Sequence, residues 1–109
     1  MDLQRKGGNM IERLQTIENR YNELTEELMK PENISDIKKT MALSKEQASL
    51  RDAYEAYQQY KQLTSDIEAA KEMSKDKELG EFAKEELVEY QAQLEKLNGE
   101  IEKWLELFN

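Results

Sequence analysis

Two clusters of glutamates are the most reactive groups that this sequence places close together. Carboxylates act as general acids or bases, or bind divalent cations, when other groups complete the site. The sequence has no histidine and no cysteine, which excludes histidine bases, catalytic triads and zinc ligands. The spacing of an EF-hand loop is also missing. We therefore interpret both clusters as solvent-exposed helix faces, in preference to a metal site. They are Glu23, Glu26 and Glu27, and Glu85, Glu86 and Glu89.

Other motifs that carry chemistry are missing too. The adjacent glycines Gly7 and Gly8 match neither of the glycine-rich fingerprints that bind phosphate. No catalytic, cofactor-binding or metal-binding residue is therefore predicted, and no cofactor is expected. We do not expect the chain to be an enzyme.

The aromatic residues are interpreted first as core. The five tyrosines lie on or beside the predicted helix seams, so packing with the hydroxyl at the rim is favoured. The alternative is that Tyr54, Tyr57 or Tyr60 helps to form a partner surface. Trp104 is expected in the core, and Leu107 and Phe108 are expected to be exposed if the chain is a fragment. The five are Tyr21, Tyr54, Tyr57, Tyr60 and Tyr90.

Composition limits the partners that the chain can bind. Its 109 residues carry a formal net charge of −8 without a basic cluster, which argues against a surface dedicated to nucleic acid or anionic membranes. No apolar run approaches the ~20 residues that span a bilayer, and no signal-peptide core is present. A cytoplasmic location is therefore expected. The length fits one domain or a piece of a larger protein.

The elements that position these residues are predicted to be helices. Over residues 77–108 the apolar residues recur at steps of 4 and 3, close to the 3.5-residue repeat of a helix that packs one narrow seam against a partner. Asp76 is expected to cap this helix. Inside it, Gly80 and Gly99 each cost about 1 kcal/mol relative to alanine. The seam consists of Leu79, Ala83, Leu87, Tyr90, Leu94, Leu97, Ile101, Trp104 and Phe108.

A shorter helix is predicted over residues 10–29. Asn9 followed by Glu12 is typical of a capping box, and the helix should stop before Pro31. Residues 1–9 have no apolar period, so we expect a disordered leader there. The seam of this helix is Met10, Leu14, Ile17, Tyr21, Leu24 and Leu28.

A second long helix is predicted over residues 35–74, with Ser35 or Asp36 as its cap. Its period is less regular near Leu43, where Ser44 and Gln47 could begin a new helix. One continuous helix is favoured because no glycine or proline interrupts it. The expected seam is Ile37, Met41, Ala48, Leu50, Ala53 or Tyr54, Tyr57, Tyr60, Leu63, Ile67, Ala70 and Met73.

Helix lengths and connections together predict the fold. Short connections between long helices make antiparallel neighbours. The first helix can cover only the half of the longer hairpin that includes residues 35–55 and the C-terminal end. The predicted fold is all-α, an antiparallel three-helix bundle with a protruding two-helix coiled-coil tip. That tip pairs residues 57–73 with residues 79–90.

With the helices placed, the residues resemble a known family. Residues 10–24 resemble the opening helix of bacterial class I peptide chain release factors, of the release-factor-one type. The resemblance covers about residues 10–103 and implies that residues 10–109 form the helical N-terminal domain of such a factor. This domain is an accessory binding module in translation termination on the ribosome. The further blocks that match in order and spacing are residues 30–32, 42–50, 57–61, 66–70 and 83–87.

The sequence departs from the family's pattern at two places. Asp76, Lys77 and Glu78 stand where the family usually has Asp-Pro-Glu, and residues 104–109 replace its usual Leu-Leu-Leu-Pro-Lys-Asp. The Gly-Gly-Gln loop that the family places at the peptidyl-transferase centre has no matching position, nor has the tripeptide that helps to read the stop codon. The resemblance therefore implies a fragment or truncated product without catalytic or codon-reading residues.

The resemblance also implies partners. In the family this domain lies towards the ribosomal stalk base and is associated with the class II release-factor GTPase. We expect such contacts on the exposed face of residues 60–85, at the predicted tip. The alternative is a structural or adaptor coiled-coil protein with no termination role. A release-factor domain should be a monomer, whereas an adaptor would more often dimerise through its uncovered half.

Overall fold

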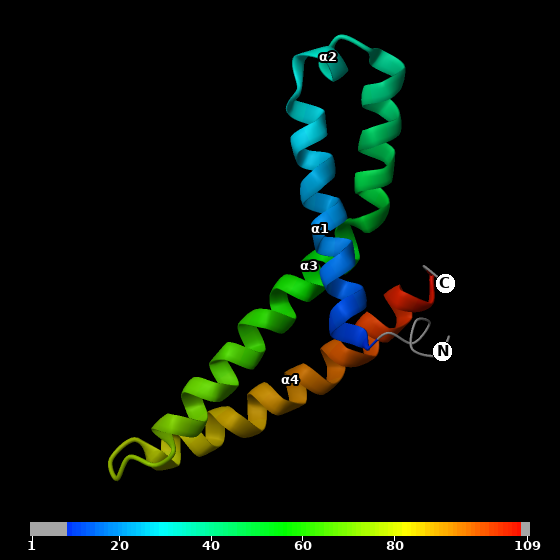
Figure 1. Ribbon diagram of the computed structural model, residues 1–109. Coiled ribbons are helices and arrows are strands. Elements are labelled where there is room, and N and C mark those ends of the chain that lie inside the picture. Colours follow the sequence, from blue (N-terminus) through cyan, green and yellow to red (C-terminus); the bar gives the residue numbers. More distant parts are fainter. Residues whose placement is uncertain (1–8, 108–109) are drawn as a thin grey trace. The chain divides into compact units, whose positions relative to one another are not determined.

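All regular structure in the described part of the chain is helical. The computed structural model describes residues 9–107, so eight residues of the expected leader lie outside it. The all-α prediction is confirmed. The helices, shown in Figure 1, are α1 (Met10–Met29), α2 (Pro31–Ile34), α3 (Ile37–Met73) and α4 (Gly80–Glu106).

Local hydrogen bonding and a proline set the two ends of the first helix. Asn9 is extended, and its Oδ1 accepts the backbone N–H of Glu12 at 2.9 Å, which satisfies one of the free donors at the start of α1. Pro31, expected in a turn, is instead the first residue of the one-turn helix α2. A missing N–H costs nothing at this position, and the fixed φ of proline already suits a helix.

The two longer helices differ from expectation at their ends. α3 runs without a break from Ile37 to Met73, so no new helix begins at Ser44. α4 begins at Gly80, later than the expected residue 77, because Asp76 caps the turn before it: its Oδ1 accepts the N–H groups of Glu78 and Leu79 at 2.7 and 3.0 Å. α4 ends at Glu106, and Leu107 already lies in a turn.

The chain divides into two compact units, which we describe separately. The N-terminal unit comprises the described residues 9–55 and 104–107, and the hairpin unit comprises Ala56–Lys103. α3 therefore contributes its first half to one unit and its second half to the other. The predicted bundle with a protruding tip depends on the placement of the two units and stays a prediction.

In the N-terminal unit, α1 lies antiparallel to the first half of α3 (Figure 1). The ring of Tyr21 on α1 stacks on that of Tyr54 on α3, with centroids 4.0 Å apart. Nη2 of Arg13 donates to the carbonyl of Leu105 at 2.8 Å and joins the start of α1 to the end of α4. The buried apolar residues of this unit are Leu14, Ile17, Leu24, Leu50, Ala53 and Leu105.

The expected seam of α3 is wrong in part in this unit. Ile37 and Met41 are 72% and 66% exposed, and Ala48 is exposed as well. Leu50 and Ala53 are buried as expected, and Leu43, which was outside the expected seam, is half-buried. The start of the inner stripe was missed because it also holds Gln47, a polar residue that bonds to α1. Apolar residues thus lie on both faces of the first half of α3.

In the hairpin unit, the second half of α3 runs antiparallel to α4, and residues 74–79 join them (Figure 1). Three alanines and four larger residues make up the core, and the alanines let the two helices approach closely. Leu79, expected in the seam, is 48% exposed because it precedes α4. The buried apolar residues here are Ala56, Tyr57, Ile67, Ala70, Ala83, Leu97 and Ile101.

Candidate interaction surfaces

Local contacts hold the loop at the end of the hairpin unit in one conformation. Oγ of Ser74 donates to the carbonyl of Lys71 at 2.7 Å, and the backbone N–H of Ser74 donates to the carbonyl of Ala70 at 2.9 Å. The two backbone N–H groups of Leu79 and Glu78 that bind Asp76 hold the pKa of its carboxyl below the usual range. A Cβ at Gly80 would lie 3.0 Å from the carbonyl oxygen of Ser74, so this close approach favours glycine.

Two large apolar side chains are exposed here, Leu79 at the end of the loop and Phe82 in the first turn of α4. Leu79 and Phe82 are 48% and 57% exposed. We call residues 74–82 the hairpin tip. It lies inside the range of residues 60–85 where sequence reasoning expected contacts. Because hydrogen bonds of Ser74 and Asp76 hold the loop beside this apolar pair, less conformational entropy would be lost when a partner binds here.

A shallow hollow lies farther along the hairpin unit. It measures about 230 Å³ and is lined by side chains of α3 and α4. Amide, ammonium and carboxylate groups surround two leucines, without any nucleophile paired to a base. It therefore offers no constellation for catalysis. The lining residues are Gln59, Leu63, Gln93, Lys96, Leu97 and Glu100.

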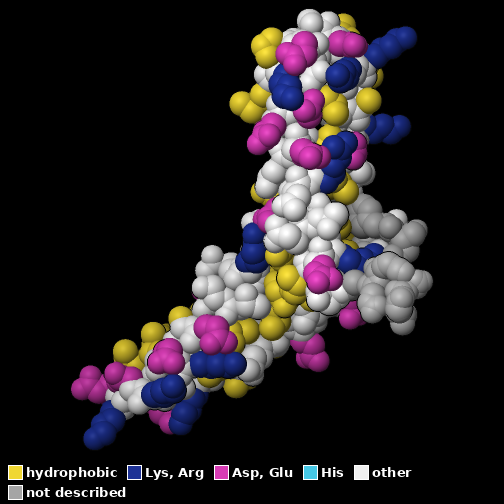
Figure 2. Space-filling model, in the orientation of Figure 1, with side chains coloured by type: hydrophobic (Ala, Val, Ile, Leu, Met, Phe, Trp, Pro, Cys, Tyr) yellow, Lys and Arg dark blue, Asp and Glu magenta, His cyan; other side chains and the backbone are white. Residues whose placement is uncertain are grey.

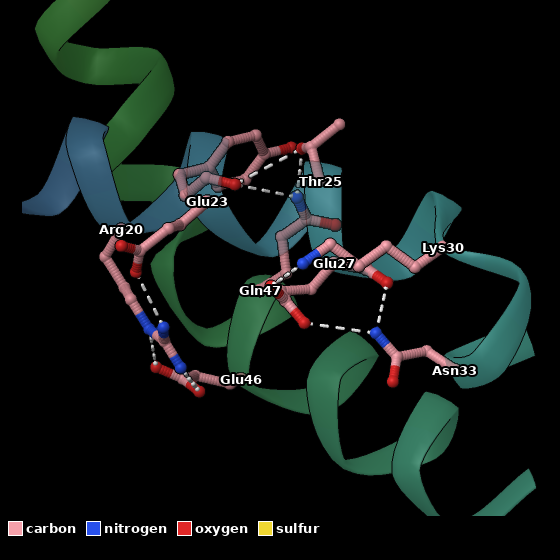
Figure 3. A network of polar contacts seen from close by, with 9 residues as sticks. Arg20, Glu23, Thr25, Glu27, Lys30, Asn33, Glu46 and Gln47 are labelled. Atoms are coloured by element: carbon pink, nitrogen blue, oxygen red, sulfur yellow. Dashed lines mark hydrogen bonds and ion pairs between the residues drawn. The ribbon is translucent and has the colours of Figure 1, made fainter. Parts of the chain in front are cut away.

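A bidentate ion pair joins α1 to α3 in the N-terminal unit (Figure 3). Nε and Nη2 of Arg20 each lie 2.7 Å from an oxygen of Glu46, and Nη1 lies 2.8 Å from Glu23. The guanidinium lowers the pKa of Glu46, and the carboxylates raise the pKa of Arg20. One turn away, Nε2 of Gln47 donates to Oγ1 of Thr25 at 2.6 Å. These bonds fix the register of the two helices.

A second polar network anchors α2. Asn33 is 1% exposed, and its Nδ2 donates to the carbonyl and to Oε1 of Glu27 at 2.7 and 3.1 Å (Figure 3). Nζ of Lys30 lies 2.8 Å from the other oxygen of Glu27, and this ion pair, followed by the bond from Asn33, lowers the pKa of Glu27. Oγ1 of Thr40 donates to the carbonyl of Asn33 at 2.6 Å. The short helix is therefore tied to both of its neighbours.

The two glutamate clusters behave differently from each other. Glu23 and Glu27 pair with Arg20, Lys30 and Asn33, and Glu23 is nevertheless exposed, as Glu85 and Glu89 are. Across residues 9–107, no three acidic groups come together in a way that could hold a metal ion. Over the same range, no helix has the length and apolar character that crossing a membrane requires.

Four of the five tyrosines are half-buried, and Tyr57 is 4% exposed. Nζ of Lys61 lies 4.6 Å from the centre of the Tyr57 ring. Glu86, together with burial and two further carboxylates, raises the pKa of Tyr90.

Sequence reasoning missed the cross-helix partners Glu46 and Gln47. The signal available was their place four and three residues before Leu50, on the stripe that faces α1.

Comparison with known proteins gives one consistent result. The family described as "PCRF domain" matches residues 17–107. Peptide chain release factor 1 of Oceanobacillus iheyensis is 44% identical over 93 residues, which are 83% of this chain and 26% of that protein. The protein of the same name from Streptococcus equi subsp. zooepidemicus is 49% identical over 88 residues, 77% of this chain and 24% of that protein. The chain thus spans about a quarter of the length of these relatives. No solved structure matches it.

Proposed function

The chain belongs to the PCRF-domain family, and from this premise we propose that it is the N-terminal domain of a peptide chain release factor that acts in translation termination on the ribosome. The observation that carries the proposal is the family match over residues 17–107, joined to 44% and 49% identity with proteins named peptide chain release factor 1. The resemblance of residues 10–24 to the opening helix of that family agrees with it.

The proposed role is that of a binding module without chemistry of its own. In a full-length factor, other domains would read the stop codon and release the nascent peptide. This domain would contact the stalk-base region of the ribosome and the class II release-factor GTPase, as a monomer in the cytoplasm. The exposed Leu79 and Phe82 on the fixed hairpin tip support a contact there.

A domain exchange tests this function. Residues 17–107 replace the matching region of release factor 1 from Oceanobacillus iheyensis, and release of a labelled peptide from ribosomes stalled at a stop codon is measured. We expect the half-saturating concentration of the chimera to stay within about tenfold of the parent, a change of ~1.4 kcal/mol in binding. The parent lacking its matching region serves as the negative control.

The contradicting result is equally definite. A chimera that is folded by circular dichroism but releases peptide no better than the deletion control would show that these residues cannot serve as the termination domain. Sedimentation velocity of the chain itself checks the oligomeric state. A monomer is expected, and a stable dimer would favour the coiled-coil adaptor.

A further inference from the structure

Asn98 and Gly99 form a chemically reactive pair inside α4. Asn98 is the only asparagine of the sequence that is followed by glycine. In such a pair the backbone nitrogen of the glycine can attack the side-chain amide carbon of the asparagine, because glycine has no side chain that would shield its nitrogen. Both residues lie in the second half of α4, between the buried residues Leu97 and Ile101.

The helix is weak at this pair. Glycine is the least favourable residue after proline in a helix interior, and asparagine also ranks low. Packing does not require a glycine here, because a Cβ at Gly99 would meet nothing within 4 Å. Oδ1 of Asn98 is buried, yet it accepts no hydrogen bond from the described residues. Opening of this turn would return that oxygen to water, so the turn should open more readily than its neighbours.

The closed helix keeps the pair unreactive. Ring closure requires the Gly99 nitrogen to eclipse the side chain of Asn98 across the Cα–C bond, and a helical ψ of about −42° holds the two apart. A helix also engages each backbone N–H with the carbonyl four residues earlier, so the attacking nitrogen is not free. Reaction therefore requires this turn of α4 to open.

We propose that Asn98 is a site of spontaneous deamidation whose rate is set by local opening of α4. In the open turn, the amide of Gly99 loses its proton to hydroxide, and its nitrogen forms a bond to Cγ of Asn98. The Cγ–Nδ2 bond breaks, and the amide group takes up a proton from water and leaves as ammonia. Water then cleaves the cyclic imide at Cγ, which gives aspartate, or at the backbone carbonyl carbon, which gives isoaspartate.

Either product would disfavour closure of the turn. Figure 2 shows Asp and Glu side chains exposed over the hairpin unit, where water solvates them. A carboxylate oxygen in place of Oδ1 of Asn98 would instead be buried, where the described residues offer it no donor. Isoaspartate also adds a methylene group to the backbone, which breaks the register of the helical hydrogen bonds. The modification would therefore loosen the hairpin unit irreversibly, whatever the function of the chain.

Mass spectrometry of the incubated chain tests the proposal. The full chain is compared with a synthetic peptide of residues 92–104, which is too short to hold a helix in water. Conversion at Asn98 is followed over time in both. We expect it to be at least about tenfold slower in the folded chain, and to rise with pH because the attacking nitrogen must lose its proton. Asn22, which is followed by Glu23, is the internal control and should convert far more slowly than Asn98 when the chain is unfolded.

Two core variants show which opening controls the rate. Ile101 and Leu24 are both 0% exposed, but only Ile101 lies one turn from Asn98. Ile101→Ala should raise the rate in the folded chain about tenfold and leave the rate of the matching peptide unchanged. Leu24→Ala, in the N-terminal unit, should leave the rate within about threefold. Circular dichroism checks that both variants are folded, and urea below the unfolding transition should speed conversion in the unsubstituted chain.

Three outcomes would overturn the proposal. Conversion as fast in the folded chain as in the peptide would show that α4 does not control the reaction. Equal acceleration by Ile101→Ala and Leu24→Ala would replace local opening by unfolding of the whole chain. An Asn98→Asp variant whose α4 amides exchange as slowly as those of the unsubstituted chain, and an isoaspartate product that does the same, would remove the structural consequence.

Discussion

The two units of the chain use different means to pair their helices. The N-terminal unit joins α1 to α3 through polar partners that cross between helices, above all Arg20 with Glu46. The hairpin unit has a core rich in small residues, among them Ala70 and Ala83, which are 3% and 0% exposed. Directional polar bonds specify one register, whereas a seam of small side chains lets two helices approach closely. Along α3, the first half thus adds ion pairs across helices to its apolar core, and the second half packs alanines beside larger apolar residues.

The difference extends to what each unit leaves exposed. In the N-terminal unit the polar network holds α2, on which Ile34 is 59% exposed. In the hairpin unit, Asp76 and Gly80 fix the loop that displays Leu79 and Phe82. In the N-terminal unit, polar contacts position the exposed apolar residue. In the hairpin unit, polar contacts and a glycine do so.

The largest expected effect on stability comes from creating a cavity in the core of one unit at a time. Leu24 in the N-terminal unit and Ile101 in the hairpin unit are both 0% exposed. Each change to alanine should lower the free energy of unfolding by about 2–5 kcal/mol. Native-state hydrogen exchange should show lost protection mainly in the unit that carries the change. Equal loss across both units would mean that the division into units has no energetic meaning. Met29→Ala, at a 70% exposed site, is the control.

Alanine substitutions at the two glycines of α4 are expected to change the free energy of unfolding in opposite directions. Alanine at Gly80 meets the carbonyl of Ser74 at 3.0 Å, and that carbonyl belongs to a bonded turn, so we expect a loss of about 1–3 kcal/mol. Alanine at Gly99 meets nothing within 4 Å, so we expect a gain of about 1 kcal/mol from helix propensity. Chemical denaturation measures both. A gain at Gly80 would show that the loop can move aside.

A smaller effect is expected when the coupling energies of the aromatic pairs in the two units are compared. Tyr21 and Tyr54 stack across helices at 4.0 Å, whereas Tyr57 and Tyr60 are neighbours on α3 with ring centres 6.4 Å apart. A double-mutant cycle to leucine should give a coupling of about 0.5–1.5 kcal/mol for the first pair. The second pair should give about 0.2–0.5 kcal/mol. Couplings of the reverse order would contradict the packing described here.

The smallest effect is a pH dependence of the N-terminal unit. Arg20 lowers the pKa of Glu46 in the folded chain, so this carboxylate contributes stability above its unfolded pKa and loses it as the pH falls through the folded value. Glu46→Gln should therefore flatten the fall in melting temperature on acidification below about pH 5. The exposed Glu85→Gln is the control. An unchanged pH profile would mean that the ion pair adds nothing to stability.

Much of the fold could be predicted because large apolar residues mark the core wherever a helix has one apolar face. That held for α1, whose seam residues Leu14 and Leu24 are 0% exposed. It failed in the first half of α3, where Ile37 and Met41 look like a seam but face solvent, while Gln47 turns inward. Periodicity cannot tell an inner stripe from an outer one when polar residues supply the inner contacts.

The candidate surfaces were predicted only in outline. The range 60–85 could be named from helix lengths and resemblance, but the exposure of Leu79 depends on where α4 begins. That start depends on the side chain of Asp76, which caps a turn and leaves the helix to begin at Gly80. The exposure of Ile37 and Met41 escaped prediction, since both residues had been assigned to the core.

The most direct test of the proposed role is the release rate of the chimera when its hairpin tip is altered. Leu79→Ser with Phe82→Ser should raise the half-saturating concentration about tenfold, as expected for the loss of a ~1.4 kcal/mol contact, and leave the rate at saturation unchanged. Val88→Ser, on an exposed site outside the tip, should change neither. A tip variant that matches the Val88 control at every concentration would contradict the assignment of partner contacts to this tip.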